Sequence, residues 1–392
     1  MVVLTGARQT GKTTLVRTLP SAPDRSFRSL DDLDVLERAR EEPDLLVRES
    51  DRLTLDEVQR APDLLRAIKR VVDDRRRAGQ FLLTGSANLL LMNAVSETLA
   101  GRAVYLRLGP LGEREKSGQP APAPWTALLE AASAEEAARV LRAVEPCPKR
   151  WRDAVLEGGL PPAVSLGPED RARWFDGYVS TYLERDLQQL SSISDLSDFR
   201  RLLRLAAHRL GGLLNRAELA RDGGLSRPTA HRWINLMEVS FQVRLLVPFS
   251  ASRTKRLVKT PKLYLGDTGL AAHLAGIAQP EAFRALPNEG AWLEHLLLNH
   301  LDNWRETVSP RPELLFWRTP EGAEVDFVLE QGRTVLPIEV KTTSRARRED
   351  AASLERFLDQ QRGARFGILV NDGAEVQLVS RRVVAAPVGR LL

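Results

Sequence analysis

The sequence predicts an α/β protein in three parts: a parallel sheet with helices, a largely helical segment, and a second α/β domain. Three observations support this prediction. Over residues 1–110, short apolar runs alternate with helix-like stretches, which is the order typical of a parallel sheet. Residues 150–262 favour helices, with one strand near their end. From residue 314 onward, short strands and turns surround one further helix.

In the first part, apolar runs that end at glycine or aspartate predict strands, and the stretches between them predict helices. The predicted strands are Val2–Thr5, Leu53–Leu55 and Gln80–Thr84, and the predicted helices are Leu15–Leu19, Asp34–Arg40 and Pro62–Arg77. Residues 116–149 are rich in alanine and proline, so we expect a linker followed by a helix. Further helices are expected over residues 284–304 and 350–361.

The composition predicts a soluble chain of two or three domains. Its 392 residues are 43% hydrophobic and 28% charged, enough to bury sizeable cores. No apolar run approaches the ~18–20 residues of a membrane span, and the first residues do not form a secretory signal. The single cysteine, Cys147, excludes an intramolecular disulfide and a multi-cysteine zinc site. We therefore expect a cytoplasmic protein without a membrane partner.

A glycine-rich loop follows the first predicted strand. Residues 6–13 fit the pattern G-x-x-x-x-G-K-[ST] without a mismatch, between a strand-like and a helix-like stretch. Backbone N–H groups of such a loop surround a phosphate, Lys12 can reach the β- and γ-phosphates, and the Thr13 hydroxyl can bind Mg²⁺. The alternative is a glycine turn that caps a helix. The predicted ATP-binding residues are Gly6, Ala7, Arg8, Gln9, Thr10, Gly11, Lys12, Thr13 and Thr14.

Two adjacent carboxylates end the strand-like sequence RLTLDEVQ. In an ATPase, Asp56 would hold Mg²⁺ and Glu57 would orient and polarise the attacking water. The alternative is an ordinary pair of charges at a strand end. The next predicted strand ends in hydroxyl groups, so Ser86 or Thr84 could sense the γ-phosphate. Alternatively, the hydroxyl bonds its own backbone in a turn.

The middle of the chain is basic. Residues 197–262 contain 14 Lys and Arg against 4 Asp and Glu, a net charge of +10 in a chain whose net charge is +5. Two predicted helices flank Gly223-Gly224, with Ser226 placed to cap the second and Arg227 and Arg232 near its start. A strand and a further basic stretch follow, an order that favours a winged helix-turn-helix in contact with DNA. A solvated basic face or a protein-docking module is the alternative.

A set of carboxylates and a lysine lies near the carboxyl end. If Gln331-Gly332 is a two-residue hairpin turn, Asp326 lies opposite Pro337. Three polar side chains then share one face of the sheet: Asp326, Glu339 and Lys341. Such a set can bind a divalent cation and position a water for phosphodiester cleavage, and Glu294 could add a ligand. The alternative is a salt-bridged strand pair on a solvated face.

Motifs along the whole chain resemble a family of bacterial and archaeal P-loop ATPases of the AAA superfamily, whose carboxyl-terminal halves are called domain of unknown function 4143. The motifs are LTGARQTGKTTL, LTLDEVQ, LLTGSAN, LAGRAVYLRLGPL, LEGGLPPAV, YVSTYLERDL, PKLYLGDTGL and the E–VDF–IEVK set. Family members usually carry a helical segment before the first strand. Here only Met1 precedes Val2, which indicates a truncated chain or a misplaced start and leaves the hold on the adenine in doubt.

The resemblance implies five segments: a P-loop AAA-type ATPase core over 1–115, the linker and helix over 116–149, a helical lid-like segment over 150–198, a winged helix-turn-helix over 199–265, and a PD-(D/E)xK restriction-endonuclease-like domain over 280–392. It implies catalytic roles for Lys12, Glu57, Asp326, Glu339 and Lys341, and metal ligands at Thr13, Asp56, Glu294, Asp326 and Glu339. It adds Arg102 at the nucleotide, as an arginine finger or a sensor. An arginine finger acts in the site of a neighbouring subunit, so that alternative implies a homo-oligomer.

The leading hypothesis is an ATP-hydrolysing protein that acts on or near DNA, with ATP and Mg²⁺ as cofactors and a nuclease-like carboxyl-terminal domain. A second hypothesis makes that domain an active Mg²⁺-dependent nuclease. A third makes the chain a nucleotide-switched adaptor whose basic segment docks a protein and which has no nuclease activity.

Overall fold

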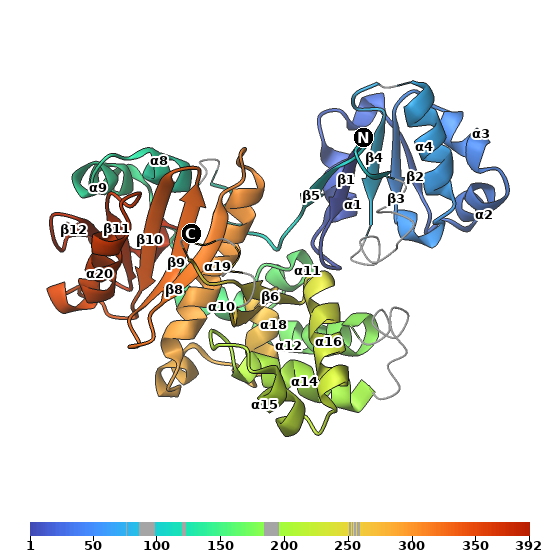
Figure 1. Ribbon diagram of the computed structural model, residues 1–392. Coiled ribbons are helices and arrows are strands. Elements are labelled where there is room, and N and C mark those ends of the chain that lie inside the picture. Colours follow the sequence, from blue (N-terminus) through green and yellow to red (C-terminus); the bar gives the residue numbers. More distant parts are fainter. Residues whose placement is uncertain are drawn as a thin grey trace. The chain divides into compact units, whose positions relative to one another are not determined.

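The computed structural model describes residues 1–75, 77–85, 99–119, 123–183, 196–250, 252, 254, 256 and 259–392 (Figure 1). The chain divides into two compact units. The first comprises Met1–Gly109, Val179–Ser194 and Ile234–Gln242, and the second comprises Pro110–Tyr178, Asp195–Trp233 and Val243–Leu392. Within the described ranges, none of the helices has the length and apolarity needed to cross a membrane.

The first unit is built on a parallel five-stranded sheet in the order β2-β3-β4-β1-β5. The strands are β1 Val2–Thr5, β2 Ser26–Ser29, β3 Leu53–Asp56, β4 Phe81–Thr84 and β5 Val104–Arg107. The helices are α1 Lys12–Thr18, α2 Leu33–Glu41, α3 Pro43–Arg48 and α4 Leu64–Asp74. Every residue of β3 is buried, as expected for a central parallel strand covered on both faces. The parallel sheet predicted from the sequence is confirmed.

β2 and β5 were not among the strands predicted from the sequence. SFRS of β2 has only one apolar residue, whereas VYLR of β5 is mostly apolar in sequence. SFRS is half-buried throughout, and VYLR is largely exposed at the sheet edge. Both strands belong to the sheet through backbone hydrogen bonds to a neighbouring strand: β2 pairs with β3, and β5 pairs with β1.

The second unit begins with helices. They are α7 Glu113–Lys116, α8 Trp125–Glu130, α9 Ala134–Ala143, α10 Trp151–Glu157, α11 Pro161–Val164, α12 Pro168–Gly177, α14 Leu196–His208, α15 Arg216–Asp222, α16 Arg227–Val239, of which the part to Trp233 lies in this unit, and α18 Thr268–Leu274. A π-helical turn spans Tyr178–Leu183, and 3₁₀ turns include Pro280–Ala285. Two antiparallel strands, β6 Val243–Leu246 and β7 Lys262–Leu265, follow α16.

The segment expected to be a linker and one helix instead holds the helices α8 and α9. Trp125 is fully buried, and its indole Nε1 donates to the Leu391 carbonyl oxygen at 3.2 Å. Leu128 and Leu129 are also buried, so α8 presents an apolar stripe at helical spacing. The alanine- and proline-rich composition concealed this stripe, which packs against the carboxyl-terminal part of the chain.

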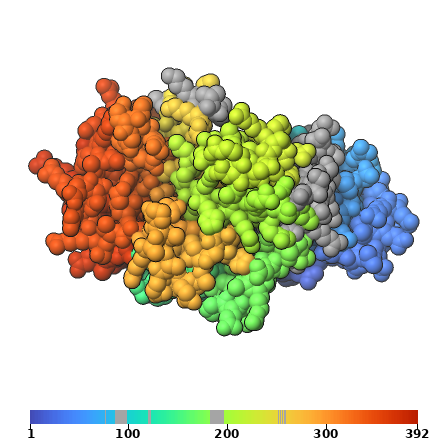
Figure 2. Space-filling model, turned by 90° about the horizontal axis from the view of Figure 1, so that it is seen from below, coloured from blue at the N-terminus to red at the C-terminus, as the bar shows by residue number. Residues whose placement is uncertain are grey.

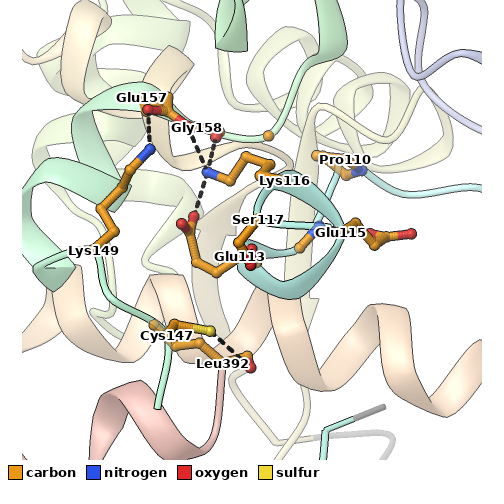
Figure 3. Close-up of polar contacts among 12 residues, drawn as sticks. Pro110, Glu113, Glu115, Lys116, Ser117, Cys147, Lys149, Glu157, Gly158 and Leu392 are labelled. Carbon is orange, nitrogen blue, oxygen red and sulfur yellow. Dashed lines mark hydrogen bonds and ion pairs between the residues drawn. The ribbon is translucent and has the colours of Figure 1, made fainter. Parts of the chain in front are cut away.

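A buried ionic cluster lies between α7 and α10 (Figure 3). Lys116 donates to the Gly158 carbonyl oxygen at 2.8 Å and forms ion pairs with Glu113 and with Glu157, the latter at 3.1 Å. Lys149 pairs with the same Glu157. Each buried charge therefore meets an opposite charge, as burial of ions requires.

The carboxyl-terminal part contains a mixed six-stranded sheet in the order β12-β13-β11-β10-β9-β8. The strands are β8 Glu313–Arg318, β9 Glu324–Gln331, β10 Thr334–Val340, β11 Gly367–Asn371, β12 Gln377–Leu378 and β13 Val383–Pro387. The helices are α19 Glu289–Glu306 and α20 Ala352–Gln360. β8, β9 and β10 form an antiparallel meander, whereas β10, β11 and β13 run parallel.

The register predicted for the β9–β10 hairpin is wrong by two residues. Pro337 pairs with Val328 rather than with Asp326, because the turn lies at Gly332 and Arg333, with Gly332 at φ 61°. A shift of two residues keeps every side chain on its face, whereas a shift of one would reverse them. Asp326 and Glu339 therefore still share a face.

Phe357 of α20 anchors the core of this sheet. Its ring is fully buried and packs edge-on against Phe249 and Trp317, with centroid separations of 5.5 and 5.4 Å. We expect Phe357→Ala to lower the free energy of unfolding by about 3–5 kcal/mol, because it leaves a cavity among fixed neighbours. Arg356→Ala on the same helix removes only an exposed ion pair with Glu321 and should cost less than about 1 kcal/mol. If urea unfolding showed the same loss of unfolding free energy for both variants, this account of the packing would be wrong.

Candidate functional site

The loop between β1 and α1 has an unusual backbone. Gly6, Gln9 and Gly11 have φ angles of 148°, 63° and 87°. A Cβ atom at Gly6 would lie 2.3 Å from the Leu108 carbonyl oxygen, so only glycine fits there. Thr10 donates its hydroxyl to the Ala7 carbonyl oxygen at 2.9 Å, which closes the loop on itself. The loop leads directly into the amino-terminal end of α1, where backbone N–H groups favour a bound phosphate.

Lys12 is held inside this loop. Its Nζ donates to the carbonyl oxygens of Gly6 and Ala7 at 3.1 and 2.7 Å. Burial lowers its pKa from 10.5 to about 8. A lysine in this position is poised to exchange carbonyl partners for phosphate oxygens, which would bind its charge more strongly.

Asp56 gathers hydroxyl groups at the carboxyl end of β3. Thr13 Oγ1 lies 3.1 and 3.0 Å from the two oxygens of its carboxylate, and Ser29 Oγ lies 3.5 Å away. Thr84 at the end of β4 also donates its hydroxyl to Asp56. A carboxylate beside a threonine hydroxyl offers the hard oxygen donors that Mg²⁺ prefers, so these residues fit that ion.

Glu57 follows Asp56 in a left-handed conformation, with φ 56° and ψ 43°. This conformation is uncommon for a residue other than glycine and marks many functional positions. Gln59 donates its side-chain amide to the Glu57 carboxylate. Sequence reasoning missed Gln59, although it belongs to the quoted DEVQ motif.

Arg102, which was predicted for the nucleotide site, does not join the site of its own chain in the structure. Arg102 forms a two-pronged ion pair with Asp73, at 2.6 and 2.9 Å. It precedes β5, whose first residue pairs with Val2, so it lies at the amino-terminal edge of the sheet. The loop lies at the opposite, carboxyl-terminal edge. Arg102 therefore does not contact the nucleotide site of its own chain, contrary to the expectation from the sequence. Ser86 lies outside the described residues.

A second polar cluster lies in the carboxyl-terminal domain, among α19, β7, β9 and β10. Lys262 Nζ lies 3.4 Å from both Glu294 Oε2 and Asp326 Oδ1, and it also pairs with Glu324. Tyr264 donates its hydroxyl to Glu294 Oε2 at 2.9 Å. Lys341, partly exposed, donates to Glu339 Oε1 at 2.7 Å.

Burial governs the electrostatics of this cluster. It raises the pKa of Glu294 to about 7, and nearby Asp326 adds to the effect. Burial likewise raises the pKa of Glu339 well above its usual value. For Lys262, burial lowers the pKa but the surrounding charges, Glu294 foremost, outweigh it and raise the pKa well above 10.5. The lysine is therefore an ammonium ion at neutral pH.

The predicted metal ligands Glu294, Asp326 and Glu339 do not form a metal site in this arrangement. Across the ranges that the structure describes, no group of three His, Cys, Asp or Glu side chains could hold a metal ion. The Lys262 ammonium lies 3.4 Å from the carboxylates of two of the predicted ligands, Glu294 and Asp326. Sequence reasoning missed Lys262, Tyr264 and Glu324. The scarcity of lysine, 8 of the 57 basic residues, could have drawn attention to Lys262 as it did to Lys341.

Not every basic side chain of residues 197–262 is exposed to a partner, although the net charge of the segment counts them all. Lys262 is buried, and Arg256 is buried with ion pairs to Glu313, at 2.8 Å, and Glu330. In contrast, Arg227 and Arg232 are exposed on the first half of α16.

Three family models match successive parts of the chain. An AAA domain matches residues 1–116, a domain of unknown function (8612) matches residues 148–281, and domain of unknown function 4143 matches residues 289–391. The crystal structure of protein VC1899 from Vibrio cholerae aligns over 95% of this chain and 89% of that chain, at 12% identity and a TM-score of 0.19, which carries no argument about function.

Two curated relatives span the entire chain. The uncharacterized proteins Mb2031c of Mycobacterium bovis and Rv2008c of Mycobacterium tuberculosis are each 34% identical to it over 395 residues, covering 100% of this chain and 81% of theirs. The chain therefore belongs to the family of these proteins, with an AAA domain at its amino-terminal end and domain of unknown function 4143 at its carboxyl-terminal end.

Proposed function

We propose that this chain binds ATP with Mg²⁺ at the loop Gly6–Thr14 and hydrolyses it. The observation that carries the proposal is the assembly of Lys12, Thr13 and Asp56 at one edge of a parallel sheet. Ligands of open α/β sheets bind at the carboxyl ends of the strands, which is where these residues lie. The match to an AAA domain supports the same reading.

Each residue has a separate task in this proposal. Backbone N–H groups of the loop and Lys12 hold the phosphates, while Thr13 and Asp56 hold Mg²⁺, which offsets phosphate charge when bound. Glu57 orients the attacking water and accepts its proton, and Gln59 fixes the Glu57 carboxylate. Arg102 has no task in the site of its own chain. The homo-oligomer that would let it act on a neighbour stays a prediction.

Removing the loop lysine tests nucleotide binding. We expect Lys12→Ala to weaken ATP binding by about 100-fold or more, because a charge-assisted contact to phosphate is lost in a buried site. Calorimetric titration with Mg²⁺-ATP measures this. Lys69→Ala on α4 is the matched control and should bind as the wild type does. Equal affinity of wild type and Lys12→Ala would refute the site.

Replacing the proposed base separates hydrolysis from binding. We expect Glu57→Gln to lower kcat by about 100-fold or more while the affinity for ATP stays within about threefold, because the amide cannot accept the proton. Phosphate release and nucleotide titration together measure both quantities. If turnover by Glu57→Gln matches that of the wild type, Glu57 is not the base.

The basic segment supports a second part of the proposal, namely contact with DNA. The elements α14, α15, α16, β6 and β7 follow the order of a winged helix, and Asn215 caps α15 through its side chain. The yellow-green surface of this segment covers a broad area of the face in Figure 2. Arg227 and Arg232 at the start of α16 are suited to phosphate contacts. The alternative remains a nucleotide-switched adaptor that docks a protein here.

Salt dependence distinguishes these two partners. The slope of log affinity for duplex DNA against log salt should fall by about 2 in the double variant Arg227→Ala/Arg232→Ala, because each phosphate contact contributes about 0.9. Arg173→Ala on α12, exposed and outside the segment, should leave the slope unchanged. Absent or salt-insensitive DNA binding by the wild type would favour the adaptor.

The order of elements in the carboxyl-terminal domain supports the restriction-endonuclease-like fold that the sequence resemblance implies. A helix, an antiparallel meander, a second helix and a parallel strand follow one another as α19, β8 to β10, α20 and β11. The proposal assigns no nuclease activity to this domain, because its carboxylates enclose a lysine.

A further inference from the structure

We propose that Lys262 is the resident cation of the carboxyl-terminal cluster, so that its ammonium group takes the place of a divalent metal ion and keeps the cluster from binding one. The cluster consists of Lys262, Tyr264, Glu294, Glu324, Asp326, Glu339 and Lys341. This inference is independent of the nucleotide site and goes beyond the proposed ATPase.

The position of Lys262 is fixed by its backbone as well as by its charge. It begins β7, where it pairs with Leu246 of β6, and it also forms a bridge to Leu213 on its other side. Its side chain is only 4% exposed, and Nζ lies 5.6 Å from the centroid of the Phe316 ring. The lysine is thus built into the sheet and enclosed, unlike a surface side chain that happens to bend inward.

The ammonium occupies the space that a metal ion would need. A divalent cation shared by Glu294 and Asp326 would lie about 2.0–2.6 Å from their oxygens. Lys262 Nζ already lies 3.4 Å from both Glu294 Oε2 and Asp326 Oδ1, so a second cation there would meet a like charge at close range.

Donors other than Lys262 also engage three oxygens of these carboxylates, one each from Asp326, Glu294 and Glu339. Asp326 Oδ2 accepts the Val340 backbone N–H at 2.8 Å. Glu294 Oε2, the oxygen that lies 3.4 Å from Lys262 Nζ, also accepts the Tyr264 hydroxyl. Lys341 holds Glu339 Oε1, and within the described part of the chain Glu339 Oε2 is buried without a hydrogen-bond partner. Mg²⁺ and Mn²⁺ require several oxygen ligands at once, and the three engaged oxygens would have to give up their donors to supply them.

Removing the ammonium should uncover the site. Lys262→Met keeps the length and apolar stem of the side chain but removes its charge, leaving carboxylates that face one another. We expect the folded variant to gain one Mn²⁺ site, and the double variant Lys262→Met/Asp326→Asn to lose it again.

The experiment is a titration of the full chain with Mn²⁺ alone, without nucleotide, followed by electron paramagnetic resonance of the free ion. Wild type and Asp326→Asn should bind Mn²⁺ within about twofold of each other, and Lys262→Met should bind about tenfold or more tightly than either. Lys259→Met, an exposed lysine of the same segment, is the matched control and should behave as the wild type does. Any weak binding at Asp56 is common to all of these proteins and cancels.

Two outcomes would overturn the proposal. One is wild-type binding about tenfold or more tighter than that of Asp326→Asn, since this would show that the cluster holds metal with Lys262 in place. The other is a Lys262→Met variant that folds, by circular dichroism, and gains no site. Should that variant fail to fold, the comparison of wild type with Asp326→Asn still decides.

Discussion

The Asp56 carboxylate connects the separate pieces of the proposed nucleotide site. It receives the Thr13 hydroxyl from the loop after β1, the Thr84 hydroxyl from the end of β4 and the Ser29 hydroxyl from the end of β2. Parallel pairing puts these strand ends at one edge, so a single acidic group can collect hydroxyls from residues far apart in the sequence. Without that carboxylate, only Thr13 would be left of the two residues proposed to hold the Mg²⁺ that accompanies the triphosphate.

Both candidate sites depend on a buried lysine, and the surroundings give the two lysines different capacities. Lys12 meets backbone carbonyls, which are neutral, and burial lowers its pKa to about 8. Lys262 meets carboxylates, whose charge raises its pKa well above the ordinary value despite burial. The positive charge of a lysine held by neutral partners is not neutralised and can bind a phosphate. The charge of a lysine held by carboxylates is already neutralised by them.

The basic segment shows why net charge along a sequence is an incomplete guide to a partner. Arg256 and Lys262 contribute to its charge of +10 but are buried against acidic side chains of α19, β8 and β9. The segment includes the strand that supplies the cluster in the carboxyl-terminal domain, so part of its basic character serves the fold. The exposed arginines of α16 are the ones that remain suited to a polyanion.

Local sequence alone determined the loop, the order of its strand and helix, and the adjacent Asp56 and Glu57, because these depend on neighbouring residues and on backbone freedom at glycine. It also determined that Asp326, Glu339 and Lys341 share a face, because the two-residue period of a strand survives an error of two in register. It could not reveal Trp125 as a core residue, since its partner Leu391 lies 266 positions away. Only the tertiary structure showed that Arg102 lies at the edge of the sheet opposite to the loop and that Lys262 lies among the carboxylates. Both positions depend on which strands, distant in the sequence, become neighbours.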